Sequence, residues 1–365
     1  MGSRNNKISM RQTMIMYIVA CLSPATRLFP SMGARYGRHA GWAGVLVGAA
    51  ALAALAHILA ALFKKDDGAP RGLADVFGSV FGRIGGKLIT AAYLLWAVLL
   101  YALYIRYYAE RMLATIFTTA DIRFFMLAMM PLVFIAARGR LEVFARFSEV
   151  SILLFTVILL ALAMCLMPTF KTENVWPVTH LDAVPILKSS YPVLGILGYL
   201  TLFFFLGEHI SNKRDAARQG RKAAVYIGVM LTLITAICIG TLSWRVVERM
   251  PAPFFSTTKL ITVMQPLDRL EALLLSEWVI SDFIIITALA FIVMNIAKKF
   301  FNLKEERRLA APVVFFGFVG GIYVAADRFA LEAFSNSAAA LAVNVAMGFG
   351  VPALTLLAGK IRRVV

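Results

Sequence analysis

Two charged residues lie inside long apolar stretches of the sequence, where charge is unusual. Arg27 lies in an apolar segment of residues 13–30, and Asp282 lies in another of residues 273–294. Ionised side chains are costly in hydrocarbon, so they usually pair with one another or line a polar cavity. We therefore predict an Arg27–Asp282 ion pair that acts as a gate or fixes one conformation. The alternative is an Arg27 that extends to the membrane surface while Asp282 faces water.

The sequence contains no motif for catalysis or metal binding. It has no serine–histidine–acid set and no Gly-rich phosphate loop, and its four histidines are too scattered to form a metal cluster. The three cysteines all fall inside apolar runs and lack the spacing of metal ligands. The sequence therefore predicts no enzymatic activity, no cofactor and no bound metal.

The composition indicates a protein embedded in a lipid bilayer. Of its 365 residues, 60% are hydrophobic and 16% are charged, whereas a soluble domain has roughly 45–50% apolar and about 25% charged residues. The net charge is +17, but the basic residues lie in short connections between apolar runs. We expect them to meet anionic lipid headgroups rather than nucleic acid. The N-terminus resembles a signal peptide, but the apolar stretch continues, so we predict that it is retained as the first span.

Ten apolar segments are candidates to cross a bilayer, whose core takes roughly 20 helical residues. They are residues 13–30, 42–63, 88–105, 124–137, 150–168, 187–207, 223–243, 273–294, 312–326 and 338–358. The segment 124–137 is short and would need local bilayer thinning to cross. With the N-terminus in the cytoplasm, 24 of the 37 Lys and Arg residues fall on the cytoplasmic side, 12 fall outside, and Arg27 lies within a span. This bias predicts a multi-pass membrane protein with both termini cytoplasmic.

Helix-breaking residues interrupt the first and the sixth of these segments. Pro24 lies in the first, and Pro192, Gly195 and Gly198 lie in the sixth. Such breaks survive in lipid only where protein or a water-lined cavity satisfies the freed backbone groups. Each broken helix opens one group of five spans, and because five is odd the two groups are inverted. We predict an all-α membrane protein with a LeuT-type five-plus-five inverted repeat, covering residues 8–168 and 185–358.

A ligand site is predicted where the two broken helices meet, because unpaired amides there attract a carboxylate. The candidate ligand-binding residues are Ser23, Ala25 and Thr26 in span one, Tyr93, Trp96 and Tyr101 in span three, Gly195, Gly198 and Tyr199 in span six, and Thr287 and Phe291 in span eight. The expected ligand is a small zwitterion such as an amino acid. Alternatively, the aromatic and small residues serve only helix packing. Ser281, Asp282 and Thr287 could hold a cation or bond neighbouring backbone.

Four stretches carry a family resemblance across nearly the whole chain. They are Lys7-Ile8-Ser9 with Gln12, the run Leu141-Glu142-Val143-Phe144-Ala145-Arg146, the run Leu187-Lys188-Ser189-Ser190-Tyr191-Pro192, and a loop with Pro253-Phe254, Leu260-Ile261, Leu267-Asp268-Arg269-Leu270-Glu271-Ala272 and Trp278. Together they resemble the B-subunit family of spore-germination nutrient receptors, within the amino acid–polyamine–organocation transporter superfamily. The chain departs from the family pattern at Arg27, where a small or apolar residue is usual, and at Gly139, which is displaced.

The resemblance implies a function and partners. Members act with an A subunit and a lipoprotein C subunit in the spore inner membrane and detect small nutrients, commonly amino acids. It implies a sensor in the spore inner membrane or cell membrane, whose ligand shifts a conformational equilibrium. The alternative is an amino-acid permease that transports its substrate by alternating access. A channel subunit fits less well, because no polar pore-lining helix is evident.

Overall fold

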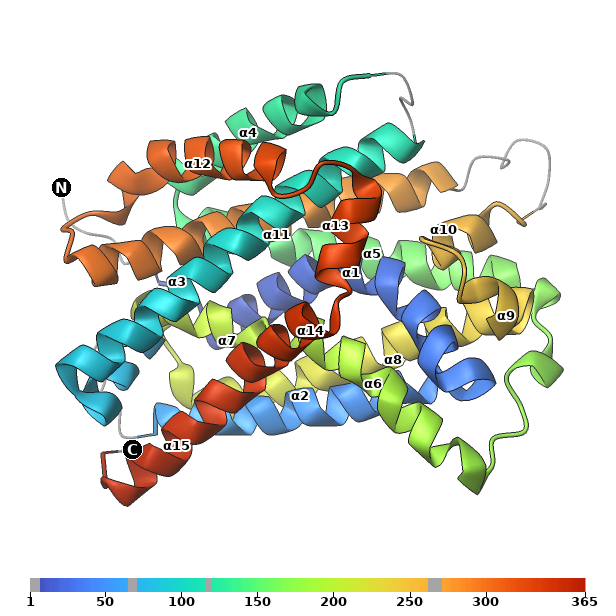
Figure 1. Ribbon diagram of the computed structural model, residues 1–365, viewed down its shortest axis with the longest axis horizontal. Coiled ribbons are helices and arrows are strands. Elements are labelled where there is room, and N and C mark those ends of the chain that lie inside the picture. The colour runs from blue at the N-terminus through green and yellow to red at the C-terminus, as the bar shows by residue number, and fades with distance from the viewer. Residues whose placement is uncertain (1–6, 65–70, 116–119, 262–270, 365) are drawn as a thin grey trace.

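The computed structural model of the chain is a bundle of long helices (Figure 1) and describes residues 7–64, 71–115, 120–261 and 271–364. The longer helices are α1 (Met10–Gly37), α2 (Ala43–Leu62), α3 (Leu73–Thr115), α4 (Ile122–Arg138), α5 (Leu141–Leu166), α6 (Ala183–Leu197), α8 (Ala216–Leu242), α11 (Glu271–Phe301), α12 (Ala310–Tyr323) and α15 (Val351–Ile361). Shorter helices are α7 (Leu200–Phe203), α9 (Trp244–Val247), α10 (Pro253–Thr258), α13 (Arg328–Ser335) and α14 (Ala338–Val345).

Membrane spans account for most of this helix content. Within the described residues, eight helices are long and apolar enough to cross a bilayer. A ninth span results if segment Glu306–Tyr323 and α13, which meet at a bend of 103°, are counted as one. Helix α4, with 17 residues, is the segment that looks short from the sequence. A multi-pass membrane protein is thus confirmed, while the tenth span stays a prediction.

Helix α1 runs through the middle of the bundle (Figure 1). Among the described spans, α1 and the segment His180–His209 that contains α6 are the most enclosed, since 89% of the most apolar stretch of each is buried. A capping box starts α1, since Ser9 accepts from the Gln12 amide and the Gln12 side chain accepts from the Ser9 amide. Pro24 and Pro30 lie inside it, yet it forms one helix from Met10 to Gly37. The predicted separation of the first span into two half-helices is therefore not confirmed.

The sixth predicted span is irregular close to its glycines. Helix α6 ends at Leu197, Gly198 and Tyr199 form a turn, and the chain continues through α7 into a 3-10 segment, Phe204–His209. The whole of His180–His209 still qualifies as one membrane span. A change of helix type thus occurs here, but the structure confirms neither a broken helix nor the inverted repeat.

Helix α3 is much longer than the predicted span of residues 88–105. It has 43 residues and bends at Gly82, whose φ of 79° favours glycine. Arg106 and Arg111 follow the predicted span of residues 88–105, which would place them in an outer connection, yet both side chains are buried on this helix. Arg106 can be buried because it pairs with Glu110 one turn further on, at 2.9 Å. It also donates to the carbonyl of Ile322 in α12 and to that of Ala326 just after α12.

Candidate ligand cavity and buried ion pair

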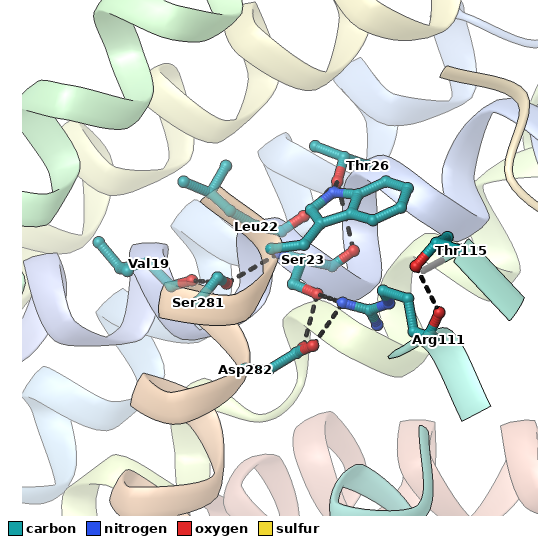
Figure 2. Close-up of polar contacts among 9 residues, drawn as sticks. Val19, Leu22, Ser23, Thr26, Arg111, Thr115, Ser281 and Asp282 are labelled. Carbon is teal, nitrogen blue, oxygen red and sulfur yellow. Dashed lines mark hydrogen bonds and ion pairs between the residues drawn. The ribbon is translucent and has the colours of Figure 1, made fainter. Parts of the chain in front are cut away.

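A buried polar cluster joins α1, α3 and α11 near the middle of the bundle (Figure 2). Arg111 Nη1 lies 2.5 Å from Asp282 Oδ2, and Ser23 donates its hydroxyl to Asp282 Oδ1 at 2.7 Å. Arg111 also donates to the Ser23 hydroxyl. Asp282 is 1% exposed and Arg111 7%. The charges of this pair compensate each other in a region without solvent, where an unpaired charge would be strongly destabilising.

The cluster also reaches the backbone of α1. Ser281 accepts from the Ser23 amide at 3.0 Å and donates to the Val19 carbonyl at 2.6 Å. These are the two groups that one hydrogen bond of a regular α-helix joins. A side chain of α11 therefore bonds both groups, immediately before Pro24, which has no amide to donate. One turn along, Trp278 donates its indole N–H to Thr26 at 3.0 Å.

Arg27 does not form the predicted pair with Asp282, whose carboxylate is taken by Arg111. Its guanidinium lies over the ring of Tyr107, 4.3 Å from the ring centroid, and its Nε has no hydrogen-bond partner among the described residues. The side chain is 8% exposed, so it does not extend freely to the surface. The ion pair exists, but its cation comes from α3, because the α3 helix continues far past the apolar run that the sequence marks.

Beside this cluster is a cavity of about 240 Å³ between α1, α3, α6 and α14. Most of its walls are apolar. Arg27 is the only charged side chain among the described residues that line it, and Trp96, Tyr104, Tyr199 and Asn344 add polar atoms. Trp96 donates to Asn344 Oδ1 at 2.8 Å, which fixes the amide against α3. An apolar pocket with one cation suits a small ligand that has one anionic end.

Of the predicted site residues, Arg27, Trp96, Gly195 and Tyr199 line this cavity. Trp96 and Tyr199 meet edge to face with ring centroids 6.0 Å apart, so their pairing forms part of the wall. Ser23, Thr26 and Asp282 belong to the adjoining polar cluster instead. Ala25 is fully buried and does not line the cavity.

The other predicted site residues lie elsewhere in the bundle. Tyr93 stacks on Phe77 and donates to the Met347 carbonyl at 2.5 Å. Tyr101 packs on Gly317 of α12, where a Cβ would come within 2.1 Å of its ring.

Gly198 and the two candidates from span eight also have packing roles. A Cβ on Gly198 would lie 3.0 Å from Gly348 Cα, so its lack of a side chain serves helix contact rather than ligand access. Thr287 is fully buried, and Phe291 packs against Phe144 of α5, 5.6 Å between ring centroids. Neither lines the cavity beside Arg27 and Trp96.

A second cavity of about 200 Å³ lies on the other side of Arg27 and Tyr107, which line both. Its lining is more strongly charged. The charged residues around it are Arg27, Glu110, Arg111, Lys259, Arg328 and Glu332. Tyr107 is held in place by a hydrogen bond between its hydroxyl and that of Ser335 on α13. The stacked Arg27 and Tyr107 side chains therefore lie between the apolar cavity and this polar cavity.

Sequence reasoning missed Arg111, Tyr107 and Asn344. For Arg111 a signal was present, because Arg106, Glu110 and Arg111 continue the helical spacing of the third span and include an i,i+4 ion pair. For Asn344, the only signal is a single amide inside an apolar run of residues 338–358. Tyr107 sits in a cluster of tyrosines that is also typical of a membrane interface.

Comparison with known proteins bears on this arrangement. A family model described as spore germination protein matches residues 7–327. The chain belongs to the spore germination protein family. It is 25% identical over 315 residues to spore germination protein KB of Bacillus subtilis (strain 168), which covers 84% of this chain and 82% of that protein. The family resemblance read from the sequence is thereby confirmed.

Some of the residues that carry this resemblance have identifiable structural roles. Ser9 and Gln12 cap α1, and Gln12 also donates to Glu149 of α5 at 3.1 Å. Glu142 pairs with Arg146 one turn later at 2.6 Å. The run Leu267-Asp268-Arg269-Leu270 lies outside the described residues. Ser9, Gln12 and Glu142 thus hold parts of the bundle together and do not line the cavity.

Proposed function

We propose that this chain is the membrane-embedded, nutrient-sensing B subunit of a spore germinant receptor, working with A and lipoprotein C subunits. Its membership of the spore germination protein family and its similarity to protein KB support this role. We further propose that it has ten spans in a LeuT-type repeat, with both termini in the cytoplasm. The irregular turn at Gly198 and the point of α1 that the Ser281 hydroxyl bonds are where that repeat would have its breaks.

The observation that carries the sensing role is the partly open apolar cavity with a single guanidinium among its described lining residues. We propose a small amino acid as ligand, with its carboxylate on Arg27 and its apolar part against Trp96 and Tyr199. Arg27 is the one cation in the lining and makes no ion pair within the described residues, so a carboxylate in the cavity would pair with its charge. Binding would shift a conformational equilibrium only as far as the ligand prefers one state. No reacting side-chain set lines the cavity in the described structure, so the proposal includes no chemical step.

The experiment is replacement of the gene in its native organism, followed by germination assays against a nutrient panel. Arg27→Gln should abolish or greatly weaken the response to amino acids at normal protein level. Leu99→Ile, on the rim of the same cavity, is a control that keeps charge and volume and should respond normally. A full response from Arg27→Gln would show that the carboxylate binds elsewhere.

The second candidate function is an amino-acid permease, favoured by the two cavities on either side of Arg27 and Tyr107. Alternating access requires a substrate path past that pair. Uptake of a radiolabelled amino acid into vesicles containing the purified chain separates the two functions. Uptake that saturates and depends on Arg27 would favour the permease, whereas binding without accumulation would favour the sensor.

A further inference from the structure

Glu277 is a buried carboxyl group that takes no part in the proposed ligand cavity. It lies on α11, its residue is 1% exposed, and both of its carboxyl oxygens lack a hydrogen-bond partner within the described structure. It does not line either of the two cavities beside Arg27. An acid in this state is a rare arrangement, since buried polar groups are nearly always hydrogen-bonded.

Asp282 on the same helix provides the contrast. It is equally buried, but Arg111 and Ser23 occupy its two oxygens, so the charged form is compensated. Glu277 has no such compensation, and an isolated carboxylate in an apolar interior is disfavoured by many kcal/mol relative to the neutral acid. These two buried acids of α11 therefore favour opposite states, the ionised form for Asp282 and the protonated form for Glu277.

The ionisable groups on neighbouring elements do not change this conclusion. Tyr226 of α8 lies close to Glu277, and the cavity that its neighbour Trp278 lines also has Arg27, Glu110, Arg111, Lys259 and the paired Arg328 and Glu332 in its walls. Arg27 lies over Tyr107, Arg111 is bound to Asp282 and Glu110 to Arg106. Tyr226 bonds Thr156, and Lys259 lies over Phe255. None of them makes a hydrogen bond or ion pair with Glu277.

Glu277 also stands next to the contact that links α11 with α1. It precedes Ser281 by four residues and so shares its helix face. Ser281 is the residue whose hydroxyl lies between the Val19 carbonyl and the Ser23 amide. A displacement of α1 at that point would change the surroundings of Glu277. Water admitted there would hydrate the carboxylate and so stabilise its ionised form.

We propose that Glu277 is a proton-binding site: it holds a proton in this conformation and releases it to water when α1 and α11 rearrange. On release its O–H bond breaks, the proton passes to water, and the carboxylate remains. The ligand of this site is thus a proton. A metal cation fits less well, because it requires several oxygen ligands and no cluster of three acidic, His or Cys side chains occurs among the described residues. The site does not depend on the identity of the nutrient.

Infrared spectroscopy of the full chain in lipid nanodiscs tests this directly, with isotopically labelled glutamate to separate Glu from Asp. At neutral pH we expect a carbonyl band from a protonated Glu side chain, which is lost in Glu277→Gln. The matched control is Glu305→Gln, an exposed acid paired with Arg308, which should leave the band unchanged. Identical spectra for the wild type and Glu277→Gln would overturn the proposal, as would loss of the wild-type band on adding sodium ions at constant pH.

A titration of the wild-type protein makes the test independent of whether the variant folds. The protonated-Glu band should persist at neutral pH, where an exposed glutamate is fully ionised, and disappear only on raising the pH further. Glu277→Gln imitates the protonated acid, so the conformational change should lose its pH dependence in that variant. A wild-type protein without any protonated glutamate at neutral pH would refute the assignment.

Discussion

Removing the carboxylate of Asp282 should destabilise the protein more than any substitution of a surface charge. The Asp282→Leu variant leaves the Arg111 guanidinium unpaired at a site where both residues are at least nine-tenths buried. Breaking such a pair from one side costs about 3–5 kcal/mol, and the Ser23 hydroxyl loses its acceptor, for about 1 kcal/mol more. The expected loss of unfolding free energy is therefore about 4–6 kcal/mol. Water that enters the site would hydrate the unpaired guanidinium and bring the loss toward the lower value.

The assay is unfolding in mixed micelles of increasing denaturing detergent, followed by circular dichroism. Arg111→Leu with Asp282→Leu removes both charges, so the double variant should be more stable than Asp282→Leu alone. Glu305→Ala breaks an exposed pair, 83% and 62% exposed at Arg308 and Glu305, and should cost roughly 0–1 kcal/mol. Strictly additive effects of the Arg111 and Asp282 substitutions would refute the reasoning, because groups in contact must show coupling.

Three further predictions concern packing, the ionic network at one end of the bundle, and topology. Gly348→Ala should cost about 1–3 kcal/mol because its Cβ would lie 2.5 Å from Gly198 Cα, while Gly350→Ala, with open space around it, should be neutral in the same unfolding assay. Glu208→Gln should cost on the order of 1–2 kcal/mol at low salt and less at high salt, because this carboxylate binds both lysines near the end of α11; an unchanged midpoint would mean the contacts contribute nothing. A single cysteine replacing Lys304, in a chain without its native cysteines, should react only with reagents admitted to the cytoplasmic side, and labelling from outside would reverse the orientation.

Sequence reasoning predicted those features that depend only on the order of residues along the chain. The apolar run at residues 42–63 corresponds to α2, Ala43–Leu62, because length and hydropathy alone define a helix in lipid. It failed at α3, where the helix continues beyond residue 105 through charged residues. Arg106 and Glu110 neutralise each other on one helix face, so charge there does not mark the end of the helix.

The candidate site shows the same division. The sequence singled out the intramembrane charges at Arg27 and Asp282, and the structure places Arg27 on the cavity wall and Asp282 in the adjoining cluster. Which cation meets Asp282 depends on how α3 crosses α11, and no spacing within the sequence determines a contact between residues 171 positions apart. In the same way, the sequence drew attention to Gly198, but its contact with Gly348, 150 positions further along the chain, could not be predicted from it.

The Ser281 hydroxyl has a mechanical consequence for the whole bundle. It is bonded to a donor and an acceptor of α1 at once, and each residue of a helix advances by only about 1.5 Å. Sliding α1 along α11 by a single residue would carry the hydroxyl away from both partners together. The two helices are thus pinned against translation, and the motion left to them is a pivot about this point. The ligand proposed above to bind between α1, α3 and α6 would then tilt these helices about Ser281, so that a small displacement at the cavity becomes a larger one at the ends of the helices.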